Sequence, residues 1–265
     1  MIRKLTDLDQ KQVLDFLYRE QAFNIFPIGD IESFGFDKDF QRVYADFDIF
    51  GNYISIFLRY RNNAIYYSIN EEFNKDYLRI FEEDPFDFFS GKAELFKDIE
   101  PYLNDFKKDV MYFVETKAFN NSNKTFPFEI KRLKTKEEAE KLFYLFQKIK
   151  EFAPYHSDLD NFISAKLNSI NMGVTLYIED GGKIISSVAT TAETTKSAMV
   201  VAVGTDPNYR KLGLASSLLE ELMKIYLLGK SKSLCLFYDN PEAGSIYKRL
   251  GFEYLGMWNI YRKRK

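Results

Sequence analysis

One stretch of this 265-residue chain has the residue types and spacing of an anion-binding turn. A strand-like run over 199–203 stops at Gly204, and a turn leads to the segment Arg210–Ala215, which opens a long amphipathic helix. The first turn of a helix has unpaired N–H groups and lies at the positive end of the dipole. The small residues Gly213 and Ala215 would let a bulky anion approach this backbone. The stretch therefore suits a pyrophosphate.

Gly213 can be tested by substitution, because a side chain there would enter the space of the phosphate. Glycine is a poor helix former and costs about 1 kcal/mol relative to alanine. If Gly213 lies in helical geometry, we therefore expect its replacement to impair cofactor binding while leaving stability unchanged or slightly higher.

A second stretch, over 238–252, follows another predicted strand and contains a short helix. Asn240 stands at the end of that strand, where its amide can bind a ligand or cap the helix. Tyr247 lies within the helix and is either a packing residue or a proton donor. A phenol with a pKa of about 10 is still protonated at neutral pH, so it can donate to a leaving group.

Together the two stretches resemble the GNAT superfamily of acyl-CoA-dependent N-acetyltransferases. The segment Arg210–Ala215 agrees with the family signature Gln/Arg-x-x-Gly-x-Gly/Ala at every fixed position. The later signature of the family is an Asn, then Ala, Tyr and Gly-Phe. It is matched by Asn240, Ala243, Tyr247 and Gly251-Phe252. The resemblance covers roughly residues 128–265.

The resemblance implies transfer of an acetyl group from acetyl-CoA to a primary amine by direct attack. The backbone of Val203–Thr205 would pair with the pantetheine arm, and N–H groups of Arg210–Ser216 would hold the pyrophosphate. Asn240 and Ser245 would contact the pantetheine or phosphate region, and Tyr247 would protonate the CoA thiolate. The implied cofactor-binding residues are Val203, Gly204, Thr205, Arg210, Lys211, Leu212, Gly213, Leu214, Ala215, Ser216, Asn240, Ser245 and Tyr247.

The general base stays open, because the strand segment 198–202 carries no carboxylate where several family members place a glutamate. Glu193 is the nearest carboxylate in sequence, although a solvated hairpin charge is the more ordinary interpretation of it. His156 lies in the connection between the first two helices of the second half, where an exposed or packing histidine is more common. Water is the third candidate.

The composition of the chain excludes several classes of binding partner and metal site. The 37 Lys+Arg nearly balance the 39 Asp+Glu, which argues against a general nucleic-acid binder. The chain has one cysteine, Cys235, and one histidine, so it cannot form an internal disulfide or a zinc site of several His and Cys ligands. We expect a cytoplasmic monomer or homodimer with no metal and no membrane segment. The acceptor would be a small-molecule amine, a peptide N-terminus or a lysine.

The polar segment Asn120–Pro127 predicts a break between a domain over 1–125 and a catalytic domain over 126–265. Both halves predict an α+β fold with a central, mostly antiparallel sheet flanked by helices, in the same element order. Strands are expected at 43–47, 53–60, 64–68 and 110–115, then at 174–179, 184–191, 199–203, 233–238 and 254–261. Helices are expected near 13–17 and over 92–106, then from 135 and over 158–170, 215–227 and 243–250.

The first half resembles a degenerate copy of the same fold. The segment 69–76, which follows its third predicted strand, carries two glutamates and no glycine, so it is poorly suited to a pyrophosphate. Two other functions stay open: a module that binds or senses acyl-CoA without turnover, and an aminoacyl or acyl transferase with two copies of the fold.

Overall fold

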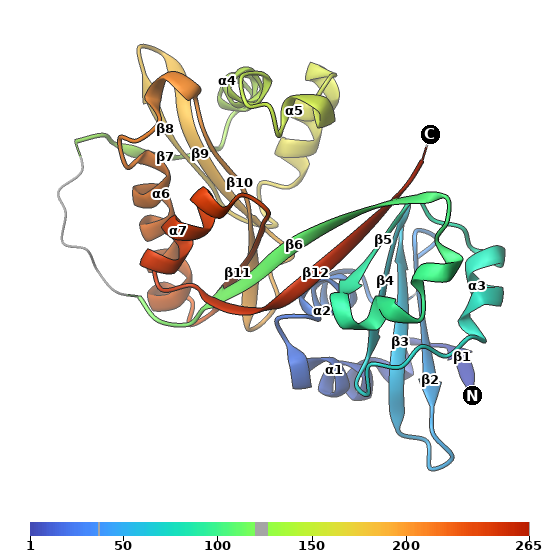
Figure 1. Ribbon diagram of the computed structural model, residues 1–265. Coiled ribbons are helices and arrows are strands. Elements are labelled where there is room, and N and C mark those ends of the chain that lie inside the picture. Colours follow the sequence, from blue (N-terminus) through green and yellow to red (C-terminus); the bar gives the residue numbers. More distant parts are fainter. Residues whose placement is uncertain (37, 120–126, 265) are drawn as a thin grey trace. The chain divides into compact units, whose positions relative to one another are not determined.

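The computed structural model describes residues 1–36, 38–119 and 127–264, and the chain divides into two compact units (Figure 1). The first unit comprises Met1–Val114, Phe237–Asp239 and Tyr254–Lys265, and the second comprises Glu115–Leu236 and Asn240–Glu253. This division differs from a single cut between 125 and 126, because the last strand of the chain groups with the first unit. Of the predicted break, residues 120–126 lie outside the described residues.

The first unit contains an α+β arrangement of helices and mostly antiparallel strands. Its strands follow the order β1-β2-β3-β4-β5-β12-β6, in which β4 and β5 are parallel. The strands are β1 (Ile2–Lys4), β2 (Gln41–Phe47), β3 (Tyr53–Tyr60), β4 (Asn63–Ser68), β5 (Phe88–Lys92), β6 (Phe106–Thr116) and β12 (Glu253–Lys263). The helices are α1 (Gln10–Leu17), α2 (Ile25–Phe34) and α3 (Tyr77–Glu83).

The second unit has the strand order β11-β10-β9-β8-β7, with β10 and β11 parallel and the other neighbours antiparallel. The strands are β7 (Ile130–Arg132), β8 (Thr175–Asp180), β9 (Lys183–Thr191), β10 (Ser197–Thr205) and β11 (Ser233–Tyr238). The helices are α4 (Lys136–Gln147), α5 (Leu159–Asn168), α6 (Leu214–Met223) with a π-helical end over Lys224–Gly229, and α7 (Pro241–Arg249).

The two units repeat one order of elements: strand, two helices, three strands, helix, strand. It runs from β1 to β5 in the first unit and from β7 to β11 in the second. In each unit the third of the three consecutive strands is parallel to the strand after the next helix. The mostly antiparallel α+β fold that the sequence predicts is therefore confirmed. A repeated order is also present, but in the first unit α3 and β5 supply its last helix and strand, in place of the predicted helix over 92–106 and strand over 110–115.

The strands of the second unit are held between two layers of helices. In Figure 1, α4 and α5 lie on one side of β8–β10 and α6 lies on the other. Every residue of β9 from Ile184 to Thr190 is buried, as a strand covered on both faces must be. A capping box starts α4, because Glu138 N–H donates to Thr135 Oγ1 and Thr135 N–H donates to Glu138 Oε2.

The predicted helix over 92–106 is wrong. The structure has a strand that ends at Lys92, then two short 3₁₀ helices, Ala93–Lys97 and Glu100–Tyr102. Pro101 lacks an N–H and its ring clashes with an earlier carbonyl, so one continuous helix cannot pass through it. The helices α2 and α3 and the short strands β1, β5 and β7 are additional to the predicted elements.

Candidate functional site

The loop between β10 and α6 is anchored at its first residue. The Asp206 side chain is 2% exposed, and its Oδ2 lies 2.6 Å from the Nζ of Lys148, the C-cap of α4. Asp206 Oδ1 also accepts the N–H of Asn208 at 3.0 Å. Burial alone would raise the pKa of this carboxyl, but Lys148 and the Asn208 N–H lower it overall. Asp206 therefore stays ionised and pins the start of the loop to α4.

The loop then exposes two residues in left-handed backbone conformation. Lys211 has φ +65° and Gly213 has φ +80°, and both are exposed. A Cβ built at Gly213, the N-cap of α6, meets no described atom within 4 Å. Left-handed residues next to ordinary ones turn successive N–H groups into one concave surface that suits an anion. The first N–H groups of α6, over 214–216, have no acceptor within their own helix and adjoin it.

The geometry of Gly213 corrects one expectation. The residue is not helical, so the prediction that its replacement leaves stability unchanged or higher does not apply. A side chain in left-handed conformation costs roughly 1–2 kcal/mol. Substitution of Gly213 should therefore lower the stability of the domain as well as fill the space above the loop.

Strand β10 extends past its partner on one side. Its parallel register with β11 covers Ser197–Val200 against Ser233–Leu236 and ends there, while β10 continues to Thr205. On the other side it stays paired with β9, through Gly204 and Thr205. A bulge lies between Val201 and Gly204, with Ala202 at φ +55°. The end of β10 therefore has an edge along which an extended ligand could add as a strand does.

The packing leaves no room for a side chain at Gly204 unless its neighbours shift. A Cβ at this position would lie 2.6 Å from Ile149 Cδ1 and 2.6 Å from Phe152 Cε2. Both contacts are far below normal van der Waals separation, so the segment after α4 lies directly on the backbone of β10 here. Sequence reasoning selected Gly204 through the family signature but missed Phe152, whose only signal is its place between α4 and α5.

A hydrogen bond connects helix α7 to the start of α6, directly after this loop. Arg249 Nη2 donates to Ser216 Oγ at 3.1 Å, which joins the end of α7 to the first turn of α6. At the start of α7, Asn240 Oδ1 accepts the N–H of Glu242 at 2.9 Å and caps the helix. The Ser245 hydroxyl donates to the Glu242 carbonyl at 2.7 Å. Sequence reasoning missed Arg249, although its place after Tyr247 on a basic helix end was a signal.

The comparisons with known proteins agree with this geometry. Residues 172–254 match the family model described as acetyltransferase (GNAT) domain, and this range contains β10, the loop, α6 and α7. This part of the chain is a GNAT acetyltransferase domain. A comparison with curated protein sequences found no match.

Solved structures extend the likeness over the whole chain. A Drosophila protein shares 12% identity over 98% of both chains, with a TM-score of 0.70. A GCN5-related N-acetyltransferase from Sphaerobacter thermophilus shares 14% identity over 99% of this chain and 95% of its own, with a TM-score of 0.63. A GCN5-related N-acetyltransferase-like protein from Streptococcus suis shares 15% identity over 96% and 100%, with a TM-score of 0.57. At these identities the likeness shows a common fold.

The catalytic candidate of the GNAT domain, Tyr247, lies on α7 and is 7% exposed. Its ring packs edge to face on Phe252, with centroids 5.9 Å apart. The packing role and the proton-donor role are compatible, because the ring can be held by Phe252 while the hydroxyl acts. The ring contact gives the side chain a fixed position on the helix.

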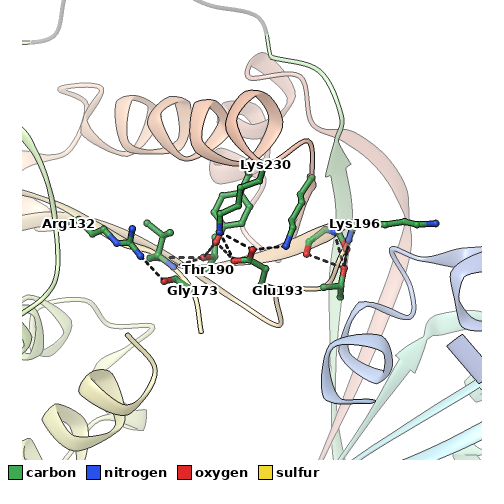
Figure 2. A network of polar contacts seen from close by, with 11 residues as sticks. Arg132, Gly173, Thr190, Glu193, Lys196 and Lys230 are labelled. Atoms are coloured by element: carbon green, nitrogen blue, oxygen red, sulfur yellow. Dashed lines mark hydrogen bonds and ion pairs between the residues drawn. The ribbon is translucent and has the colours of Figure 1, made fainter. Parts of the chain in front are cut away.

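Glu193 is held in a structural network at the far end of β10. Its carboxylate lies 2.8 Å from Lys230 Nζ and 2.7 Å from Lys232 Nζ, and it accepts the Tyr226 hydroxyl at 2.8 Å (Figure 2). Burial alone would raise its pKa, but these three donors lower it overall. Glu193 lies in the turn before Ser197, and Ser197 is about 20 Å from Val203 along β10 at about 3.3 Å per residue. The geometry therefore opposes Glu193 as the base of the GNAT domain.

We expect Glu193→Gln to lower the free energy of unfolding by about 1–3 kcal/mol and to leave kcat unchanged. The variant deprives two lysines and Tyr226 of a buried charged acceptor. Since the folded-state pKa of Glu193 is lowered, its contribution is present above pH about 4.5 and is lost as the pH falls through the folded value. Urea unfolding at pH 7 and pH 4 measures both effects.

The matched control is Glu83→Gln, which removes an exposed i,i+4 ion pair with Arg79 in the first unit. Exposed pairs contribute roughly 0–1 kcal/mol, so this change should be small. A large fall in kcat for Glu193→Gln with normal stability would return Glu193 to the catalytic candidates.

His156 packs in an aromatic cluster after α4. Its ring lies 5.1 Å from that of Phe146 and 5.0 Å from that of Phe162. Burial and the neighbouring ammonium of Lys166 lower the pKa of His156, which favours the neutral imidazole at pH 7. Phe146 in turn contacts Phe152, the residue on Gly204, at 4.7 Å. The structure thus brings His156 toward the end of β10 and keeps Glu193 away from it.

No group of three or more His, Cys, Asp or Glu that could hold a metal ion occurs among residues 1–36, 38–119 and 127–264. Within the same ranges no helix is long and apolar enough to cross a membrane.

Proposed function

We propose that the GNAT domain transfers the acetyl group of acetyl-CoA to a primary amine. The observation that carries the proposal is one continuous surface. The partnerless edge at the end of β10 leads into an exposed loop with two left-handed residues and then into the start of α6. An extended arm that ends in a pyrophosphate needs those two features in that order.

Each part of the donor has a matching part of the site. The backbone of Val203–Thr205 would pair with the pantetheine arm as an added strand. The N–H groups of Arg210–Ser216 would hold the pyrophosphate, where the open space at Gly213 admits its oxygens. Asn240 and Ser245 use their side chains within α7 in the described structure, so we assign them to the wall of the arm.

The reaction forms a C–N bond to the acetyl carbonyl carbon and breaks the C–S bond to CoA. A backbone N–H of β10 near Val203 would polarise the thioester oxygen. Tyr247 would give its proton to the departing thiolate, and the amine would lose one proton to a base. We propose His156 for that base, with water as the alternative, because the lowered pKa of His156 keeps its ring neutral and able to accept.

The acceptor class follows from the reaction: a small-molecule amine, a peptide N-terminus or a lysine side chain. The protein would act as a monomer or homodimer in the cytoplasm, without a nucleic acid or a membrane.

A screen of mixed amines with acetyl-CoA tests the proposed acetyl transfer, and the release of the free thiol of CoA is measured. Tight acetyl-CoA binding without thiol release from any amine would favour a sensing module. Transfer from an aminoacyl or longer acyl donor in place of acetyl-CoA would favour the tandem acyl transferase.

The first unit offers a poorer loop at the corresponding place. The segment 69–76 between β4 and α3 carries Glu71 and Glu72, and Glu71 is paired with Lys92 at 2.6 Å. Helix α3 has seven residues, and the ring of its first residue, Tyr77, is fully buried. Carboxylates and a buried helix start are unfavourable for a pyrophosphate, so we propose that this unit does not bind acetyl-CoA.

We therefore expect one acetyl-CoA site per chain. Titration calorimetry on the full chain should give a stoichiometry of one, because the loop of the second unit has a glycine and an open helix start that the segment 69–76 lacks. Two equivalent sites in the full chain would contradict the proposal. Binding that persists in a variant with a disrupted Gly213 loop would place the site elsewhere.

A further inference from the structure

A half-buried lysine without a carboxylate partner lies in the aromatic cluster beside His156. The Nζ of Lys166, on α5, is 5.8 Å from the ring centroid of Phe146 and 5.7 Å from that of Phe162. Among the ion pairs of the described residues, none includes Lys166. Burial also lowers the pKa of its ammonium.

The position of Lys166 connects it to the end of β10 by a chain of direct contacts. Phe146, beneath the ammonium, packs on Phe152 with centroids 4.7 Å apart. Phe152 lies on the backbone of Gly204. The ion pair of Lys148 with Asp206 holds this end of α4 at the same end of the strand. Lys166 is therefore linked through α4 and the segment after it to the end of β10, where the acetyl group is proposed to lie.

We propose that Lys166 binds an anionic group, a carboxylate or a phosphate, on the amine acceptor. This inference rests on the proposed acetyl transfer and specifies its acceptor. A bound anion would supply the negative charge that the described residues do not place beside this ammonium. A charge-assisted bond in a partly desolvated site is stronger than one in water. The rings of Phe146 and Phe162 are buried in the core and would hold the lysine side chain. The acceptor would lie over the half-buried Phe152 and His156, with its amine toward the end of β10.

Matched pairs of acceptors test the proposal. Tyramine is compared with tyrosine, tryptamine with tryptophan, and glucosamine with glucosamine 6-phosphate, by thiol release from acetyl-CoA. We expect the anionic member of at least one pair to have a kcat/KM about 10- to 100-fold higher. The amino acids and the sugar phosphate distinguish a carboxylate from a phosphate. Equal rates within every pair, or a preference for the neutral members, would overturn the proposal.

Variants of Lys166 test whether this residue binds the anionic group of the acceptor. Lys166→Met should remove the preference by raising the KM of the anionic acceptor about 10- to 100-fold relative to that of its neutral partner. Lys166→Arg should restore most of the preference. Lys136→Met, at the exposed start of α4, is the control and should change neither. A preference that survives Lys166→Met would assign the anion to another residue and refute the proposal.

A second readout does not depend on turnover. Lys166 is labelled with an amine-reactive acetate ester in the full chain, and its modification is followed by peptide mass spectrometry. Phenylacetate or inorganic phosphate should slow labelling of Lys166 but not of Lys136, whereas phenylethanol should slow neither. Unchanged labelling with both anions would overturn the anion site. Absence of thiol release from every amine, with Lys166 still protected, would instead contradict the proposed acetyl transfer.

Discussion

Tyr247→Phe should lower kcat by about 10²–10⁴-fold while the Kd of acetyl-CoA stays close to that of the unchanged protein. The phenol is needed when the thiolate leaves, so its loss should appear in the chemical step and not in binding. Tyr247 is 7% exposed and packs on Phe252, a contact that phenylalanine retains. Steady-state thiol release, with the best amine of the screen, measures kcat, and calorimetry measures the Kd.

The control for this experiment is a buried tyrosine of the second unit that the proposal does not place in the site. Tyr177 on β8 is 2% exposed and donates to Glu138 Oε1 at 2.8 Å. Tyr177→Phe should lower the free energy of unfolding by about 1 kcal/mol and leave kcat unchanged. If Tyr247→Phe also left kcat unchanged, water would become the better proton donor to the thiolate.

Gly213→Glu should weaken acetyl-CoA binding at least about 100-fold and lower the free energy of unfolding by roughly 1–2 kcal/mol. The side chain would fill the open space above the loop and bring a negative charge to a pyrophosphate. The stability cost has a separate cause, which is the left-handed φ of +80° at this residue. Acetyl-CoA titration and thermal unfolding measure the two effects independently.

Gly51→Glu is a closely matched control. Gly51 lies between β2 and β3 in the first unit with φ +84°, and a Cβ there also meets no described atom within 4 Å. The same substitution therefore carries a similar backbone cost and the same charge, in the other unit. Equal acetyl-CoA affinity in the two variants would refute the assignment of 210–213 to the pyrophosphate, and so would a Gly213 variant that loses binding only because it unfolds.

Local patterns were sufficient for most strands. The sequence predicts β3 over 53–60 with the observed bounds, and its strand over 233–238 has the bounds of β11. Local patterns failed over 92–106, where the buried residues Leu95, Phe96, Ile99 and Leu103 have helical spacing. Pro101 and the core of the first unit decide that segment, and periodicity does not contain either effect.

The candidate bases show where distance in sequence misleads. Glu193 precedes β10 by only four residues, yet Lys230, Lys232 and Tyr226 hold its carboxylate. These partners are more than thirty residues away, so no local pattern could reveal them. His156 stays a candidate base, because the fold links it to the end of β10. Its ring packs on Phe146, and the contact of Phe152 with Gly204 exists only in the folded unit.

The sequence by itself determined the family resemblance, the α+β class and the two short segments that would hold the donor. These depend on neighbouring residues: Arg210, Gly213 and Ala215 in one turn, and Asn240 and Tyr247 on one short helix. Only the tertiary structure decided the left-handed geometry of Gly213, the capture of Asp206 by Lys148 and the position of Lys166. The last two arise from contacts between separate elements of the fold, where burial and charge are set by the partner and not by the local sequence.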